Sequence, residues 1–230
     1  VAPVALGFAL EQAGSLALAV LAELLSGDFL GEPLDLGTRA PPESRAALLQ
    51  ADLLPLRTRG RHIVDRGGRR VRLRCVNWYG AHLPELVAGG LGRRTLKSMA
   101  FTISALGFNC VRLPYSTELQ MASKGPLHQA LRANPQLMNS TGLEVLDATI
   151  AALTHVQVMV VLNNHQGKAM WCCSESDGEG LWYTPEYPED VWLQSLRSLA
   201  RRYHRNPFVI GYDLRNEPRG VPAGDAAGGM

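Results

Sequence analysis

Several features that assign a protein to a broad class are scarce in this sequence of 230 residues. The formal net charge is only +2, from 23 basic and 21 acidic residues, so the chain has no electrostatic footprint for nucleic acid or for an anionic membrane. Its four cysteines show neither a CxxC spacing nor a Cys/His pair at zinc-finger spacing. No predicted strand is followed by a glycine-rich phosphate loop, which argues against a nucleotide-binding fold.

Long apolar runs are also scarce. The run Ala13–Ala22 is flanked by Glu11 and Glu23, whereas a helix needs about 20 apolar residues to span a bilayer. No basic residue precedes this run, as a secretory signal peptide would require. We therefore expect an Ala/Leu-rich helix over residues 4–25 and no membrane partner; a degraded secretory leader is the competing interpretation.

The first 55 residues differ in composition from the rest of the chain. Residues 26–55 are rich in Gly, Pro, Asp and Glu and contain Pro41-Pro42, which is typical of a linker. We therefore predict an N-terminal extension of helix plus linker over residues 1–55, followed by one domain over residues 56–230.

Beyond residue 56, β-prone and helical segments alternate. Two β-prone runs, residues 61–64 and 71–76, flank a turn signal and predict a hairpin. Apolar spacing then predicts helices over residues 93–106, 142–154 and 189–203, and strands over residues 110–113 (ended by Pro114), 156–162 and 208–214. Such alternation predicts an α/β fold with a parallel sheet and helices outside it.

Polar and aromatic side chains follow each predicted strand of this sheet. They are Asn77-Trp78, Arg112 with Tyr115, Asn164-His165 and Asn216-Glu217. In a (β/α)₈ TIM barrel the active site lies at the carboxyl ends of the strands, so this distribution favours that fold. Because such a barrel typically needs ~250 residues, we interpret residues 56–217 as its first half, truncated after about strand four.

The segment 211–218, Gly-Tyr-Asp-Leu-Arg-Asn-Glu-Pro, carries the strongest chemical signal. Glycoside hydrolysis needs a carboxyl group that donates a proton to the leaving oxygen, and a glutamate at a strand end provides one. The segment resembles the strand-four signature of glycoside hydrolase family 5, the endoglucanase (cellulase) family. Residues 76–78, 106–115 and 161–165 resemble the family's first three strand motifs in the expected order, and residues 171–180 look like a subgroup found in plants and other eukaryotes.

The resemblance implies a role for each matching residue. Glu217 would be the general acid/base, and Asn216 would bind the 2-hydroxyl group of the sugar at the cleavage site. Arg112 would lie beneath the nucleophilic carboxylate and keep it ionised, because a nearby cation favours the charged form. His165 would bind the sugar at the same subsite. The alternatives are an ordinary ion-pair partner for Arg112 and a core histidine with satisfied hydrogen bonds for His165.

Three tryptophans, Trp78, Trp171 and Trp182, are candidates for stacking against pyranose rings. Each is explained equally well by ordinary packing, because tryptophan is largely buried on average. The neighbouring Cys172 and Cys173 are not expected to bond to each other, and the sequence leaves the pairing of the four cysteines open.

The resemblance implies a hydrolase of O-glycosyl bonds, a retaining endo-β-glycanase of the cellulase type, acting on β-linked polysaccharide or oligosaccharide. It implies no metal and no organic cofactor, and it makes secretion a stronger expectation than a cytoplasmic location.

The family's nucleophile is a second glutamate on strand seven, ~5–5.5 Å from the acid/base. No glutamate follows Glu217, so we expect this chain to be inactive alone. The alternatives are a non-catalytic carbohydrate-binding fragment or degenerate glycosidase, and an unrelated α/β domain with a chance Asn-Glu-Pro.

Overall fold

The computed structural model describes residues 53–121, 125–174 and 176–219. The predicted helix over residues 4–25 and nearly all of the predicted linker over residues 26–55 lie outside these ranges. Within them, no helix combines the length and the apolar character needed to cross a membrane.

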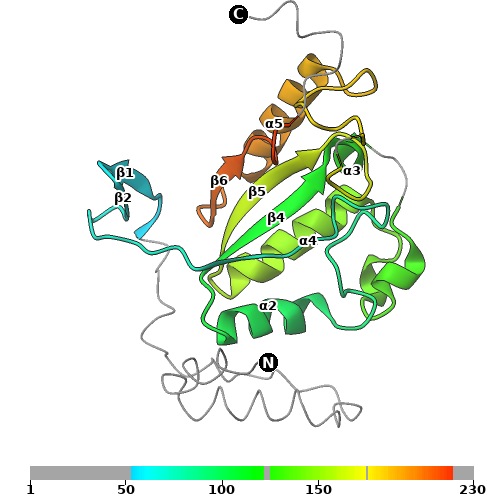
Figure 1. Cartoon of the computed structure of the whole chain (residues 1–230). Coiled ribbons are helices and arrows are strands. Elements are labelled where there is room, and N and C mark those ends of the chain that lie inside the picture. The colour runs from blue at the N-terminus through cyan, green and yellow to red at the C-terminus, as the bar shows by residue number, and fades with distance from the viewer. Residues whose placement is uncertain (1–52, 122–124, 175, 220–230) are drawn as a thin grey trace, which may run out of the picture. The chain divides into compact units, whose positions relative to one another are not determined.

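Four parallel strands form the central sheet, in the order β3-β4-β5-β6; β4, β5 and β6 are labelled side by side in Figure 1. They are β3 (Cys75–Asn77), β4 (Cys110–Ser116), β5 (Met159–Gln166) and β6 (Val209–Asp213). Successive strands are connected by α2 (Leu96–Ala105), α4 (Gly142–His155) and α5 (Glu189–Tyr203), with the short elements α3 (Thr117–Met121), η2 (His128–Leu131) and η3 (Pro135–Leu137) between β4 and α4. The predicted strand–helix alternation is therefore confirmed.

The two faces of the sheet differ in chemistry because side chains alternate along a strand. Val111, Leu113 and Tyr115 of β4 lie in the main core, which also contains buried residues of α2, α4 and α5. The alternate residues Cys110 and Arg112 lie on the opposite face. Apart from a small apolar cluster at its amino-terminal end, that face carries polar groups. In a (β/α)₈ barrel the helices cover the outer face of the sheet, so the face that carries Arg112 corresponds to the inside, with its polar groups toward the carboxyl ends of the strands.

The ends of α2 and α4 follow local signals in the sequence. Thr95 caps α2 by accepting a hydrogen bond from the Ser98 amide, and Gly107, with φ of +84°, ends it. Thr141 and Glu144 form a reciprocal capping box at the start of α4. Leu106, predicted on the apolar face of α2, is instead 54% exposed.

The predicted hairpin forms only in part. The antiparallel ladder of β2 (His62–Val64) is with β1 (Arg57–Arg59), whereas the second predicted run meets β2 only at its start, through an antiparallel bridge between Val64 and Arg70 and a hydrogen bond from the Val71 amide to the Ile63 carbonyl. The Asp65 carboxylate accepts hydrogen bonds from the amide and the guanidinium of Arg69, which folds the intervening segment into a compact loop. Beyond Val71 the run leaves β2 and continues into β3.

Strand β4 does not end at Pro114, as predicted, but continues to Ser116. The Arg112 carbonyl accepts a hydrogen bond from the Trp78 amide on the β3 side of the strand. Pro114 has the same orientation, yet β3 pairs only as far as Asn77. The N–H group that proline lacks would therefore have no partner strand, so proline is tolerated there.

Strand β5 begins and ends later than the predicted residues 156–162. Its start is delayed because Gln157 adopts a left-handed conformation, with φ of +60°, in the turn after α4. Its end extends through Asn163, Asn164 and His165 to Gln166. These polar residues thus lie on a paired strand rather than in a loop, which fixes their directions.

A disulfide joins Cys75 of β3 to Cys110 of β4, which are directly paired in the sheet. The sequence left this pairing open. Because β3 has only three residues, the covalent link compensates for the short ladder, and a loop of this size is typically stabilised by about 3–4 kcal/mol.

We expect replacement of Gly80 to damage the fold. Its φ is +124°, and a Cβ there would overlap the Gly89 nitrogen and the Val87 carbonyl oxygen. Gly80→Ala should lower the free energy of unfolding by roughly 2–4 kcal/mol, through strain and overlap together. The matched control is Gly211→Ala in β6, where a Cβ meets nothing within 4 Å. Urea denaturation checks both variants, and equal losses would contradict the prediction.

Candidate active site

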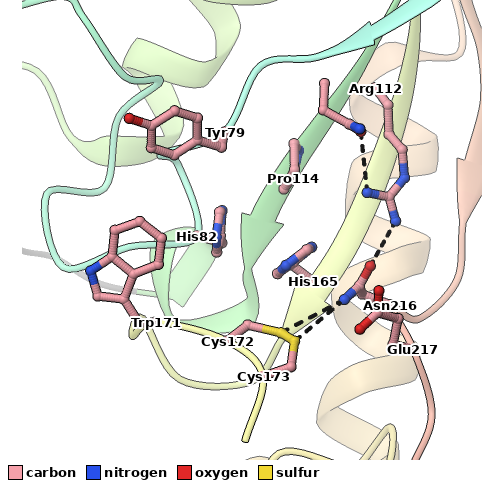
Figure 2. A pocket seen from close by; sticks show the side chains of 11 residues that line it. Tyr79, His82, Arg112, Pro114, His165, Trp171, Cys172, Cys173, Asn216 and Glu217 are labelled. Atoms are coloured by element: carbon pink, nitrogen blue, oxygen red, sulfur yellow. Dashed lines mark hydrogen bonds between the residues drawn. A yellow bond between two sulfur atoms is a disulfide. The ribbon is translucent and has the colours of Figure 1, made fainter. Parts of the chain in front are cut away.

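An open cavity of about 440 Å³ lies at the carboxyl ends of the parallel strands (Figure 2). Five of the residues singled out in the sequence line it: Arg112, His165, Trp171, Asn216 and Glu217. They come from the ends of β4, β5 and β6 and from the loop after β5. The cavity therefore collects side chains that are up to about a hundred positions apart in the sequence.

Glu217 lies just beyond β6, with an exposed side chain at the cavity wall. Its backbone φ is +38°, a left-handed conformation that non-glycine residues seldom adopt. The preceding residue holds this turn in place, because the Asn216 amide donates a hydrogen bond to the Asn164 carbonyl at the end of β5. Such strained positions cluster at functional sites.

Arg112 ties the strand ends together. Its Nε and Nη2 atoms lie 2.9 and 2.5 Å from Asp213 Oδ2, and Nη2 also donates to Asn216 Oδ1 at 2.9 Å. Nη1 reaches Asn77 Oδ1 at 3.3 Å. Within the described residues, the ion-pair partner of Arg112 is thus Asp213, and Arg112 also fixes the orientation of the Asn216 amide.

Asp213 is a site residue that the sequence analysis missed. A register shift between Val160 and Val161, where β5 pairs with β6, changes the alternation of β6. Tyr212 consequently points toward the helices and donates to the Leu199 carbonyl, whereas Asp213 points to the polar face. Gly211 lies at this shift, and a glycine inside a strand often marks a bulge, so it was the signal that could have found Asp213.

His165 contacts a second histidine, His82, which the sequence analysis also missed. Their ring centroids are 4.2 Å apart, and His82 is 4% exposed with Nδ1 buried and unpartnered. Burial, together with the smaller effect of the Arg112 charge, lowers the pKa of His82 to about 4. Burial likewise lowers the pKa of His165 to about 3, with the His82 and Arg112 charges adding to the effect. Both rings are therefore neutral near pH 7.

The neutral state of His165 fixes its hydrogen-bonding pattern. Its Nδ1 lies 2.7 Å from Asn163 Oδ1, which only accepts hydrogen bonds, so Nδ1 carries the proton. The lone pair then lies on Nε2. His165 thus offers an acceptor for a hydroxyl group, or a ligand atom for a metal ion.

The predicted tryptophans have different locations. Trp171 is 69% exposed at the cavity, and its ring centroid is 6.3 Å from that of Tyr79, which is 55% exposed. Trp78 is only 5% exposed and donates to the Gly89 carbonyl, so its faces cannot stack on a sugar. Trp182 packs against Tyr183 outside the cavity lining. Tyr79 was missed, although strand alternation from Asn77 would have pointed to it.

A buried ion pair supports the segment that carries Glu217. Arg215 and Glu179 are 9% and 5% exposed, and their Nη2 and Oε2 atoms are 3.0 Å apart. The Glu179 carboxylate also accepts from the Gly167 and Lys168 amides at 2.6 and 3.0 Å. Arg215 in turn reaches Asn164 Oδ1 at 3.3 Å. The loop after β5 is thereby clamped to the end of β6.

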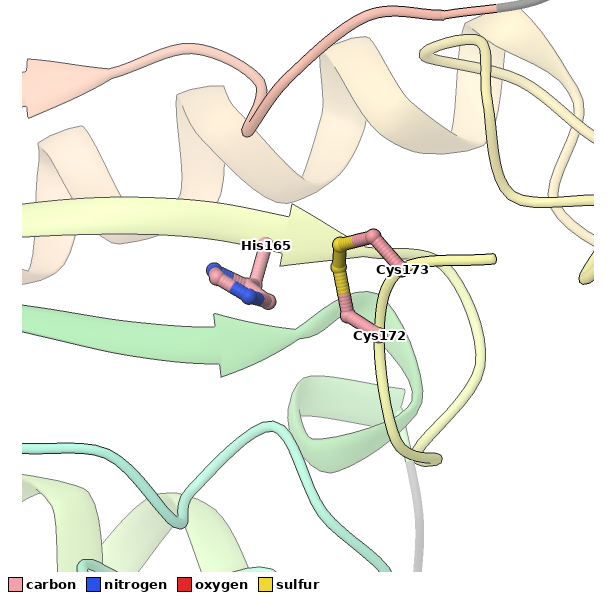
Figure 3. Close-up of side chains that lie close together, drawn as sticks. All are labelled: His165, Cys172 and Cys173. Carbon is pink, nitrogen blue, oxygen red and sulfur yellow. A yellow bond between two sulfur atoms is a disulfide. The ribbon is translucent and has the colours of Figure 1, made fainter. Parts of the chain in front are cut away.

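Cys172 and Cys173 differ from expectation, because the structure joins their sulfur atoms in a disulfide. Both side chains point to the same side of the chain, toward the end of β5 (Figure 3). The Asn216 Nδ2 atom lies 3.7 and 3.6 Å from the two sulfur atoms. The pair therefore forms part of the cavity wall beside the Asn-Glu segment.

Residues 64–227 match the family model of cellulase (glycosyl hydrolase family 5). This chain belongs to glycosyl hydrolase family 5. Family membership confirms the resemblance seen in the strand-end motifs and makes the chain a glycoside hydrolase by family. Members of this family are built on the (β/α)₈ barrel, in agreement with the predicted fold; truncation after strand four stays a prediction.

Curated relatives support the assignment. A glycosyl hydrolase 5 family protein of Chamaecyparis obtusa is 39% identical over 184 residues, covering 73% of this chain and 33% of the relative. The major extracellular endoglucanase of Xanthomonas campestris pv. campestris is 38% identical, with 70% and 32% covered. An endoglucanase of Paenibacillus polymyxa is 34% identical, with 71% and 40% covered. The chain thus spans about a third of the length of these relatives.

Solved structures show the same partial match. The catalytic domain of the Xanthomonas campestris enzyme superposes with a TM-score of 0.65 at 36% identity, covering 75% of this chain and 49% of that one. An endocellulase of Pyrococcus horikoshii in complex with cellotetraose superposes with a TM-score of 0.66 at 29% identity, covering 77% and 47%. The family's fold is therefore shared over slightly less than half of each solved chain.

We expect Glu179→Gln to be severely destabilising. The change leaves the Arg215 guanidinium buried without its counter-charge, which typically costs about 3–5 kcal/mol in the free energy of unfolding. The matched control is Glu186→Gln, because the Lys168–Glu186 pair is long, at 3.9 Å, and more than half exposed; we expect a loss below about 1 kcal/mol. Chemical denaturation compares the two, and equal effects would contradict a supporting role for Glu179.

The two neighbouring histidines, His82 and His165, should make the fold sensitive to acid. Their pKa values of about 4 and about 3 in the folded state lie below the ordinary value of 6.5. The unfolded chain therefore binds more protons as the pH falls from about 6.5 toward 3, and the free energy of unfolding decreases across that window. Denaturation at a series of pH values measures the slope.

A variant pair isolates the histidine contribution. His82→Phe removes one of the two groups and should flatten the slope between pH 6.5 and 4, whereas His128→Gln, at an exposed position, should leave it unchanged. An unaltered slope in His82→Phe would show that the acid sensitivity arises elsewhere.

Proposed function

We propose that this chain supplies the acid/base part of a retaining endo-β-glycanase site that hydrolyses β-linked glucan. The observation that carries the proposal is the position of Glu217 at the wall of an open cavity that it shares with Arg112 and His165. Relatives named as endoglucanases and a solved relative in complex with cellotetraose support the substrate class.

The proposed chemistry begins with proton donation. Glu217 protonates the glycosidic oxygen as the bond from the anomeric carbon to that oxygen breaks, while a carboxylate on the other side forms a glycosyl ester. Glu217 then removes a proton from water, whose oxygen attacks the anomeric carbon and releases the carboxylate. The leaving sugar departs with the proton that Glu217 donated, and water returns Glu217 and the nucleophilic carboxylate to their starting forms, with no metal or organic cofactor.

The other groups would position the sugar. Arg112 holds Asn216 through Oδ1, which leaves the Nδ2 group of Asn216 to donate to the 2-hydroxyl. The His165 Nε2 atom accepts from a neighbouring hydroxyl. Trp171 and Tyr79 offer exposed rings at the cavity for stacking on pyranose faces.

We infer that the nucleophile comes from outside these 230 residues. A retaining mechanism places the two carboxyl groups ~5–5.5 Å apart. Asp213 is engaged by Arg112 and Asn163, and no glutamate follows Glu217 in the sequence. The chain alone would then bind glucan without completing the double displacement.

Secretion is part of the proposal. The disulfide between Cys75 and Cys110 is typical of oxidising compartments, and the Xanthomonas campestris relative is named an extracellular enzyme.

A second candidate function is carbohydrate binding without cleavage. It is favoured by the pairing of Arg112 with Asp213, because Arg112 then has a counter-charge without any nucleophile. Turnover by a polypeptide that carries the complete site would reject this candidate.

The direct test replaces Glu217 by Gln in a polypeptide that carries the complete barrel. Loss of proton transfer should reduce kcat on a soluble β-glucan by roughly 10²–10⁴-fold, measured as released reducing ends. Glu186→Gln, at an exposed loop position outside the cavity lining, should retain full activity. Equal activity of Glu217→Gln and the unaltered protein would end the acid/base assignment.

A further inference from the structure

Arginine is concentrated in one short stretch of the chain, residues 57–74, which we call the arginine segment. It contains eight of the 23 basic residues and one of the 21 acidic residues, so it carries a formal charge of +7 while the remaining residues together carry −5. The small net charge of the whole chain is therefore the sum of two opposite local charges, and such asymmetry is a common sign of a surface that binds a charged polymer. The eight are Arg57, Arg59, Arg61, Arg66, Arg69, Arg70, Arg72 and Arg74.

The fold gathers these side chains on one small unit. Strand β1 pairs with β2, and the loop that follows β2 folds back on the pair. The guanidinium of Arg57 donates to the Arg66 carbonyl at 2.8 Å, and that of Arg59 donates to the Gly68 carbonyl at 3.2 Å. All eight arginines are exposed. Residues that are up to 17 positions apart in the sequence thus form one basic surface.

The described residues supply little negative charge to this surface. Among them, the ion pair of the segment joins Arg69 to Asp65, with 3.1 Å between Nε and Oδ2. The other seven arginines have no carboxylate partner in that part of the chain: Arg57, Arg59 and Arg74 donate to backbone carbonyls, and Arg61, Arg66, Arg70 and Arg72 make no side-chain hydrogen bond. Like charges held this close repel one another, and an anionic partner relieves that repulsion.

The arginine segment lies at the end of the sheet opposite the cavity. Leu56 and Leu73, close to its two ends, pack against an apolar cluster that contains Cys110 and Met159, the first residues of β4 and β5. The cavity lies at the carboxyl ends of the same strands, and the seven residues of β4 span about 20 Å. A polymer bound to the arginine segment would therefore leave the cavity open.

We propose that the arginine segment binds an anionic polysaccharide through the carboxylate or sulfate groups of that polymer. A guanidinium can donate two parallel hydrogen bonds to the oxygens of such a group. The backbone carbonyls that hold Arg57 and Arg59 reduce the side-chain entropy lost on binding. The choice of a polysaccharide rests on the secretion included in the proposed function, which the disulfide at Cys75, directly after the segment, supports.

Two other classes of polyanion fit the segment less well. It contains no Phe, Tyr or Trp on which nucleic-acid bases could stack, and no helix that could enter a groove of a duplex. It exposes no large apolar side chain that could insert into an anionic bilayer. Charge without stacking or insertion groups is what a hydrophilic, charged sugar polymer requires.

Binding of the full chain to soluble polygalacturonate and to dextran sulfate tests the proposal. The chain should bind at least one of them in about 50 mM NaCl and lose at least roughly tenfold in affinity in about 500 mM NaCl, because salt screens the charges and competes for them. Arg61→Gln/Arg70→Gln/Arg72→Gln should weaken binding by roughly ten- to a hundredfold. The tighter of the two polymers identifies the charged group, and no binding to either overturns the proposal.

The matched control removes the same charge elsewhere. Arg197→Gln/Arg201→Gln/Arg205→Gln replaces three exposed arginines in and just after α5, and it should change the affinity by less than about threefold because these charges lie outside the proposed surface. Equal losses in the two triple variants would show an effect of net charge alone and overturn the proposal.

Hydrogen–deuterium exchange of the natural sequence covers the case in which circular dichroism shows that the first triple variant is misfolded. The bound polysaccharide should slow exchange of the amides of residues 57–74, and protection confined to other parts of the chain overturns the assignment. Tighter binding to a single-stranded DNA oligonucleotide, or to phosphatidylserine vesicles, than to either polysaccharide overturns the choice of partner.

Glu217→Gln separates this proposal from the catalytic one. Because Glu217 lines the cavity at the other end of the strands, the variant should bind the anionic polysaccharide with unchanged affinity. Unchanged binding supports the arginine segment whether or not the acid/base assignment holds. Loss of binding in Glu217→Gln would place the polymer in the cavity and overturn the separate surface.

Discussion

The rest of the site depends on the hydrogen bonds around a single guanidinium, that of Arg112. Every strand of the parallel sheet contributes to this network: Asn77 from β3, Arg112 from β4, Asn163 from β5 and Asp213 from β6. A partly buried charge is tolerated only when such partners compensate it. Because the network needs all four strand ends in one register, it links the pairing of the sheet to the geometry of the cavity.

The network also explains why the segment after β6 has a defined shape. Arg112 orients the Asn216 amide on the polar face, while the buried pair of Arg215 and Glu179 clamps the same segment from the loop side. Consecutive residues are thus held from opposite directions, which leaves Glu217 at the cavity wall in a left-handed backbone conformation. The strain there is balanced by rigid contacts made by its neighbours.

Much of this architecture was predictable because it arises from local chemistry. Helix α5 and the capped starts of α2 and α4 follow apolar spacing and side-chain signals, and the strand-end motifs identified the family. The errors arise where distant contacts decide. The hairpin partner of β2 and the continuation of β4 beyond Pro114 depend on which strand lies alongside. The missed site residues have the same origin, since a bulge turns Asp213 inward and His82 lies in a loop that only tertiary packing brings to His165.

The charge balance of the cavity bears on the kind of sugar it can accept. The charge of Arg112 is offset by Asp213, and the lowered pKa values of His82 and His165 keep both rings neutral at neutral pH. Among the described lining residues, Glu217 then remains as the one whose side chain can carry an uncompensated charge, and that charge is negative when the carboxyl is ionised. In this part of the cavity lining, a uronic acid or sulfated sugar would meet no free cation to compensate for its lost hydration, whereas neutral hydroxyls meet amide donors, an imidazole lone pair and aromatic faces. The part of the site that these residues form therefore suits a neutral sugar better than an anionic one, in line with the β-linked glucan of the proposed function.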